Sequence, residues 1–92
     1  MRRVLKYPIE VQDSFTVRIP VAHRVVHVGL QDDAPFMWVE VDDDSFSHAH
    51  TFYVEGTGHE LMSGALHVGT FVQGPFVWHV YEGQLWRLDP NV

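Results

Sequence analysis

The sequence contains no cysteine in its 92 residues. This absence excludes disulfide bonds, thiolate nucleophiles and cysteine-ligated zinc sites, and it is typical of proteins that fold in a reducing cytosol. Basic side chains are also scarce, because six Lys and Arg stand against twelve Asp and Glu and give a formal net charge of −6. The six are scattered rather than gathered in a stripe that could neutralise a phosphate backbone, so duplex nucleic acid is not expected as a partner.

Long apolar runs are missing as well. No segment approaches the roughly 20 apolar residues of a membrane span, and the first residues lack the apolar stretch of a secretory signal. We therefore expect a soluble, intracellular protein without membrane contact. Apolar residues at the helical spacing i, i+3, i+4 do not recur either, so helices are not expected to build the core.

Short apolar segments separated by turns are what the chain has instead. With 46% hydrophobic and 13% aromatic residues, it has the composition of a folded globular protein. Alternating apolar and polar residues, with turn signals about every 8 to 12 residues, predict an all-β fold of about seven short strands, a small antiparallel β-sandwich or open barrel. The predicted strands are 4–9, 14–19, 24–30, 36–41, 48–55, 66–72 and 76–82.

We predict a single domain, residues 1–92, in which residues 83–92 form a C-terminal extension. The apolar Leu85, Trp86 and Leu88 of this extension are expected to dock on the body of the domain or on a neighbouring subunit.

For two of the predicted strands, the sequence also indicates a position within a sheet. Pro8 cannot donate a ladder hydrogen bond, so the first strand belongs at a sheet edge or enters a sheet late. The strand at 36–41 is apolar on both sides near its start, which is typical of a central strand or of an interface.

A Gly-Pro turn joins two apolar runs and predicts a β-hairpin over residues 64–82, with Val72 opposite Phe76. This register turns Thr70 toward the core and Phe71 away from it. The outer face is then too apolar to be simply solvated, so we expect a second sheet, a partner subunit or a ligand to cover it.

Four short motifs follow one another along the chain: Lys6-Tyr7-Pro8, Gly56-Thr57-Gly58-His59, Gly69-Thr70 and Val77-Trp78-His79-Val80-Tyr81-Glu82. Through them, residues from about 3 to 82 resemble a family of small bacteriophage proteins of unknown function. The resemblance implies a phage origin and a location in the host cytoplasm. It supplies no activity, although small phage proteins of this kind are often accessory or counter-defence factors.

Seven histidines make metal binding a hypothesis to weigh. His48 and His50 are two apart on a predicted strand, so their Cβ atoms point to one side roughly 7 Å apart and two imidazoles can bridge to one zinc ion. His59 could add a third ligand and leave a coordination position open for hydrolysis. Against this, no carboxylate is placed to orient the imidazoles, and strand-start and turn histidines commonly bond backbone groups. The main prediction is therefore no metal and no cofactor, with this set as the alternative.

The turn Gly56-Thr57-Gly58-His59 offers backbone amides, a hydroxyl and an imidazole, a combination that can hold an anion such as a phosphate. It lacks the Lys and the following helix of a P-loop, and it could equally be a Gly-rich turn that needs positive φ. His67 and His79 could act as an acid and base near pH 7, but no nucleophile stands at a supporting spacing. The predicted ligand-binding residues are Gly56, Thr57, Gly58, His59, His67, His79 and Tyr81.

The favoured functional hypothesis is a non-enzymatic phage accessory protein that forms a homo-oligomer and binds a small nucleotide-type ligand as a counter-defence factor. It rests on more aromatic side chains than a 92-residue domain can bury. One alternative is the histidine-ligated metal-dependent hydrolase. The other is an acidic module that binds and blocks a host protein. Its acidic face would consist of Asp32, Asp33, Asp42, Asp43 and Asp44.

Overall fold

The computed structural model describes residues 1–61 and 63–83. Within them the chain forms seven strands and no helix, and the bounds differ from the predicted ones by at most two residues. The strands are β1 (Arg2–Pro8), β2 (Ser14–Pro20), β3 (His23–Gln31), β4 (Ala34–Asp42), β5 (Ser47–Gly56), β6 (Leu66–Gln73) and β7 (Phe76–Glu82). The predicted docking of Leu85, Trp86 and Leu88 lies outside the described residues. This part of the chain holds no helix long and apolar enough to cross a bilayer.

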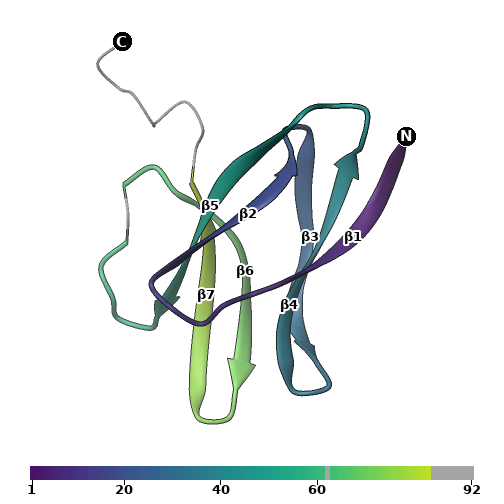
Figure 1. Cartoon of the computed structure of the whole chain (residues 1–92). Helices are drawn as coiled ribbons and strands as arrows, with labels where there is room; N and C mark the ends of the chain where they lie inside the picture. The colour runs from purple at the N-terminus through teal and green to yellow at the C-terminus, as the bar shows by residue number, and fades with distance from the viewer. Residues whose placement is uncertain (62, 84–92) are drawn as a thin grey trace.

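The strands form two antiparallel sheets, with the order β1-β4-β3 in one and β2-β5-β7-β6 in the other. Figure 1 shows the two sheets side by side, with β3 of the first next to β6 of the second, where the sheets meet. The sheets do not close into a barrel. The prediction of a small antiparallel all-β domain is confirmed.

Both predicted strand positions are also confirmed. Among the described strands, β1 pairs only with β4 and forms an edge. Pro8 lies at the end of β1 opposite Phe36, where a missing N–H costs least. β4 pairs with β1 on one side and with β3 on the other and is the central strand of its sheet. Met37 is buried on its inner face, while Phe36 and Trp38 are half-buried on the other.

The core lies between the two sheets and takes alternate residues from their strands, as a half-buried pleated surface requires. The rings of Phe15 and Phe52 stack there with their centroids 5.5 Å apart. Its buried members are Ile9, Phe15, Ile19, Val28, Met37, Val39, Val41, Phe52, Val54, Phe71 and Val80.

The predicted register of the β6–β7 hairpin is wrong by one residue. Gly74 has a φ of +57° and forms, with Pro75, a two-residue turn that leaves Gln73 paired with Phe76. Glycine at the first central position with positive φ is the requirement of a type II′ hairpin turn, whose twist matches the flanking strands. Phe71 consequently faces the core at 4% exposure. Thr70 is the residue that faces outward.

A β-bulge between His67 and Gly69 then cancels this shift. The extra residue restores the pairing of His67 with Tyr81 and of Leu66 with Glu82, both of which the sequence predicted. The bulge brings Gly69 against Val28 of the other sheet, so closely that a Cβ on Gly69 would lie 2.4 Å from Val28 Cγ2.

We expect Gly69→Ala to destabilise the domain by about 1–3 kcal/mol, because the added methyl group would push the two sheets apart. Gly29→Ala is the matched control. The three atoms nearest to a Cβ there all belong to the imidazole of His27, which is exposed and can swing aside. Urea unfolding of both variants measures the difference. Equal free energies of unfolding for the two variants would contradict the close approach of the sheets at Gly69.

Candidate functional site

The Gly56–His59 turn follows β5 directly and is tied together by its own hydrogen bonds. His59 N donates to the carbonyl of Gly56 at 3.1 Å, and Gly56 N donates back to His59 Nδ1 at 3.3 Å. Gly58 has a φ of +93°, which explains a glycine at that position. The His59 imidazole packs on Gly56, where a Cβ would lie 3.2 Å from its Cε1 atom.

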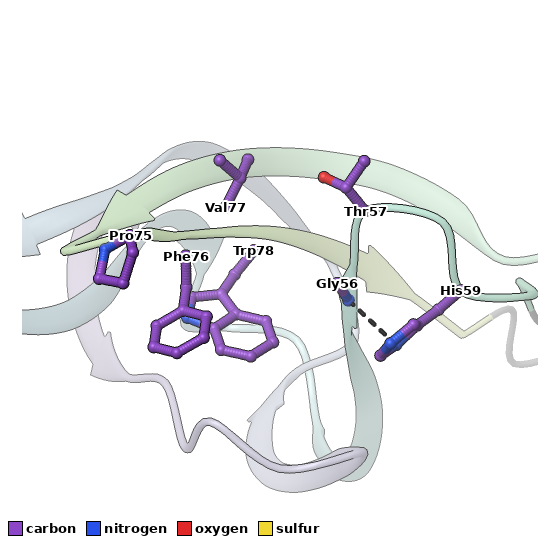
Figure 2. A pocket seen from close by; sticks show the side chains of 7 residues that line it. All are labelled: Gly56, Thr57, His59, Pro75, Phe76, Val77 and Trp78. Carbon is purple, nitrogen blue, oxygen red and sulfur yellow. Dashed lines mark hydrogen bonds between the residues drawn. The ribbon is translucent and has the colours of Figure 1, made fainter.

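A cavity of about 410 Å³ opens between this turn and the start of β7. The rings of Phe76 and Trp78 stack on one side of it, with centroids 5.5 Å apart and planes 23° apart. Figure 2 shows these two rings side by side with the His59 imidazole facing them, while Val77 and Thr57 point the other way. The cavity is lined by Gly56, Thr57, His59, Pro75, Phe76, Val77 and Trp78.

The strand register builds this cavity, because Gly56 of β5 pairs with Trp78 of β7. A second cavity of about 210 Å³ lies beside it and shares His59 and Trp78 as walls. Trp78 Nε1 is buried and has no hydrogen-bond partner among the described residues. An indole N–H without an acceptor is a donor that a ligand or water can satisfy.

The predicted residues His67, His79 and Tyr81 come together on the outer face of β6 and β7. His79 Nε2 lies 2.9 Å from Thr57 Oγ1, and its Nδ1 lies 3.0 Å from Thr70 Oγ1. Thr70 Oγ1 is in turn 2.9 Å from His67 Nε2. Thr57 therefore joins this polar chain to the turn. Sequence reasoning missed Thr70, because the one-residue register error placed it in the core.

The ring of Tyr81 extends this chain, with its centroid 5.3 Å from that of His67. Of the predicted ligand-binding residues, Gly56, Thr57 and His59 line the cavity. His79, His67 and Tyr81 lie behind it on the outer face, in the polar chain that begins at Thr57.

The alternative metal set of His48, His50 and His59 is not brought together. His59 lies beyond the end of β5 and contacts the last two residues of that strand, Glu55 and Gly56. His50 instead meets His23 and Glu82, and one ligand atom from each of these three residues lies within 4.8 Å of the others. His48 Nε2 is 2.8 Å from His50 Nδ1, which confirms that the two point to the same side.

Sequence reasoning missed His23 and Glu82 at this cluster. A signal for Glu82 was present, because it follows Trp78 and Val80 on the row of β7 that faces the core. A carboxylate on such a row needs a partner when it is buried. His23 carried no comparable signal, since its place follows from how the two sheets pack.

The charges in this cluster follow from its hydrogen bonds. His23 Nδ1 is 2.8 Å from the carbonyl of Pro20, and His23 Nε2 bonds Glu82 Oε1. Both partners accept, so His23 donates from both nitrogens as an imidazolium. Its hydrogen bond to Glu82, opposed by burial, raises the pKa of His23. Burial acts to raise the pKa of Glu82, but the contacts with His23 and His50 bring it down to about 2.

The pKa of His48 shifts in the opposite direction to that of His23. Burial, followed by the neighbouring charges of His50 and His23, lowers the pKa of His48. It is therefore a neutral imidazole that can accept a hydrogen bond from its neighbour. His50 is buried at 7% exposure. Its Nε2 lies 3.0 Å from Glu82 Oε1 but outside hydrogen-bonding geometry, which leaves that atom without a partner.

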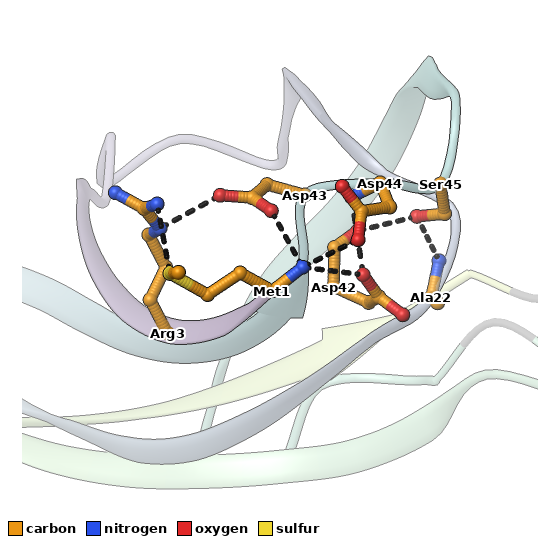
Figure 3. Close-up of polar contacts among 7 residues, drawn as sticks. All are labelled: Met1, Arg3, Ala22, Asp42, Asp43, Asp44 and Ser45. Atoms are coloured by element: carbon orange, nitrogen blue, oxygen red, sulfur yellow. Dashed lines mark hydrogen bonds and ion pairs between the residues drawn. The ribbon is translucent and has the colours of Figure 1, made fainter.

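The acidic run Asp42 to Asp44 surrounds the amino terminus. The amine of Met1 lies 2.6 Å from Asp44 Oδ2, 3.1 Å from Asp43 Oδ1 and 3.5 Å from Asp42 Oδ1 (Figure 3). Its hydrogen bonds, first to Asp44 and then to Asp43, raise the pKa of the amine to about 10. Arg3 Nε adds a second cation 2.7 Å from Asp43 Oδ2. These carboxylates are thus compensated within the chain.

Comparison with known proteins identifies a family for the chain, but this family has no described activity. No curated protein and no solved structure matches the chain. A family described as a domain of unknown function, DUF7352, matches residues 1–87 and so spans all seven strands, the turn cavity and the buried histidine cluster. The chain belongs to this family of domains of unknown function.

Proposed function

We propose that the chain is a non-enzymatic binding protein that holds a small nucleotide-type ligand in the cavity between the Gly56–His59 turn and the start of β7. The observation that carries the proposal is the stacked pair of Phe76 and Trp78 facing His59 across about 410 Å³. This volume is that of a small-molecule site. Any nucleobase can stack on an aromatic ring, because every base has a π-face.

The ring of the ligand supplies most of the binding energy in this proposal. Among the described residues that line the cavity there is no Lys or Arg, and the imidazole of His59 is the one ionisable side chain. The carboxylate of Glu55 lies 3.8 Å from His59 Nδ1 and weakens the attraction for a phosphate further. The backbone dipoles of the turn would therefore bind the phosphate, while the base would stack on the aromatic wall formed by Phe76 and Trp78.

We expect purified protein to show a thermal shift with at least one member of a panel of nucleosides and nucleotides, because a ligand that binds only the folded state stabilises it. Phe76→Ala removes half of the aromatic wall and should weaken the affinity on the order of ten-fold, the loss of one stacking contact. Phe46→Ala is the matched control, because this phenylalanine is also exposed, at 72%, and lies away from the cavity.

Isothermal titration of wild-type protein and both variants gives the affinities. The proposal fails if no member of the panel binds wild-type protein, or if Phe46→Ala weakens binding as much as Phe76→Ala. A nucleoside that binds about as well as its nucleotide would support the dominant role of the ring.

Self-association is part of the same proposal. Val72 and Val77 face each other across the hairpin and remain 60% and 38% exposed, and Phe76 beside them is 56% exposed. Such an apolar cross-strand pair at the surface is typical of a contact with another protein surface. Val77 also lines the cavity, but its side chain points away from the aromatic wall, so the proposed contact lies on the outer face of the hairpin beside the cavity.

We expect the sedimentation mass of wild-type protein to rise with concentration toward that of an oligomer. Val72→Lys should hold the protein at the monomer mass, since a buried lysine in the contact would lose its hydration. Val26→Lys, at a position that is 43% exposed on β3 outside this patch, should leave the mass unchanged. A monomer mass for wild-type protein at all concentrations would contradict the proposal.

A bacteriophage origin, a location in the host cytoplasm and a role in counter-defence belong to the proposal through the sequence resemblance. The hydrolase alternative is less favoured, because His59 lies in the turn after the end of β5, whereas His48 and His50 lie near the start of that strand. The acidic-module alternative is weakened by the pairing of the Asp42–Asp44 carboxylates with the chain's own amine and Arg3.

A further inference from the structure

The histidine cluster at the other end of β5 has the composition and shape of a metal site. His23 comes from the start of β3, His50 from β5 and Glu82 from the end of β7, so three strands of both sheets converge there. The phenyl ring of Phe52 closes the inner side, with its centroid 5.3 Å from that of His50. The side chains of His23 and His50 are only 6% and 8% exposed.

We propose that Nε2 of His23, Nε2 of His50 and the carboxylate of Glu82 bind one divalent transition-metal ion, with zinc as the matching ion. Two imidazoles and one carboxylate are an established ligand set for zinc, which leaves a fourth position open. This site is separate from the turn cavity, because the six residue steps along β5 from His50 to Gly56 span roughly 20 Å.

The spacing of the ligand atoms suits such an ion. Metal–ligand distances of about 2.0–2.2 Å in a tetrahedral arrangement put neighbouring ligand atoms roughly 3.3–3.6 Å apart. His50 Nε2 and Glu82 Oε1 are already 3.0 Å apart. All three ligand atoms lie within 4.8 Å of one another, so small side-chain rotations are enough to close the site.

The outer hydrogen bonds orient both imidazoles for coordination through Nε2. His23 Nδ1 is held by the carbonyl of Pro20 at 2.8 Å, and His50 Nδ1 is held by His48 Nε2 at 2.8 Å. Metal-ligating histidines almost always donate their other ring N–H in this way, to a carbonyl or another acceptor. His48 is thus a positioning residue.

An unpartnered atom aimed at Glu82 is the second observation that points to an ion. Without a metal, His23 and His50 both direct Nε2 at the same oxygen of Glu82, and only His23 makes a hydrogen bond. Among the described residues, His50 Nε2 is left buried without a partner, as is Nδ1 of the neighbouring His48, and such atoms are costly in a core. Zinc binding would release the Nε2 proton of the His23 imidazolium, because an imidazole nitrogen must be deprotonated to bind a metal. A divalent ion between the three groups would then satisfy both nitrogens and the carboxylate at once.

The test begins with full-length protein freed of metal by a chelator and then titrated with zinc chloride. Elemental analysis after gel filtration should find one zinc per chain, and the midpoint of thermal unfolding should rise by several degrees through linkage. His50→Ala and Glu82→Gln should lose stoichiometric zinc. His27→Ala, which removes an exposed histidine elsewhere on the surface, and His59→Ala, which belongs to the alternative set, should retain it.

Cobalt provides a readout that does not depend on the folding of the cluster variants. Wild-type protein loaded with Co²⁺ should give the intense visible absorption of a low-coordinate ion bound by nitrogen and oxygen. The proposal is overturned if wild-type protein binds no stoichiometric zinc, if its cobalt spectrum equals that of the hydrated ion, or if His27→Ala or His59→Ala abolishes binding. Binding of nucleosides in the turn cavity is measured separately, so either proposal can fail alone.

Discussion

The antiparallel pairing of β5 with β7 is the constraint on which both candidate sites depend. Its register sets Gly56 opposite Trp78 at one end and Phe52 opposite Glu82 at the other. The first pair brings the Gly-rich turn against the aromatic wall of the cavity. The second sends the carboxylate of Glu82 beside His50. A slip of one residue would turn Trp78 and Glu82 to the outer face and remove both sites together.

Two features of this small domain are costly unless something binds. Glu82 and three histidines occupy a buried cluster in which His50 Nε2 has no partner, and groups of this kind are expensive to desolvate. At the hairpin, Val72, Phe76 and Val77 expose apolar surface that the rest of the described chain leaves uncovered. A bound ion, a stacked ring or a second copy offsets these costs, because each stabilises only the folded state. The proposals for the two ends of β5 therefore share one physical origin.

The strands and the edge position of β1 were predictable because they follow from local rules. Alternation, strand-forming residue types and turn signals located the seven described strands, and Pro8 indicated the edge at β1. The register of the β6–β7 hairpin was not predictable, because a Gly-Pro pair suits either a two-residue or a longer turn. The bulge before Gly69 depends on the approach of Val28 from the other sheet, and a single sequence does not display such contacts.

The turn cavity and the buried histidine cluster were predictable only where they depend on local sequence features. The turn at Gly56–His59 and the common side of His48 and His50 are local features, and the sequence indicated both. The aromatic wall of the cavity required the order β5-β7, and the convergence of His23 with Glu82 required the packing of two sheets. The core-facing position of Glu82 was the one local sign of the buried cluster.

The register of β5 and β7 is tested most directly by an engineered disulfide, because the chain has no cysteine to compete. Tyr53 and Tyr81 are directly opposite, so their Cβ atoms should lie roughly 4.5–5.5 Å apart, close to disulfide reach. Thiol titration after mild oxidation of the native double variant Tyr53→Cys, Tyr81→Cys should find no free thiol. Free thiols in that variant, together with closure in Tyr53→Cys, Val80→Cys, would contradict the account.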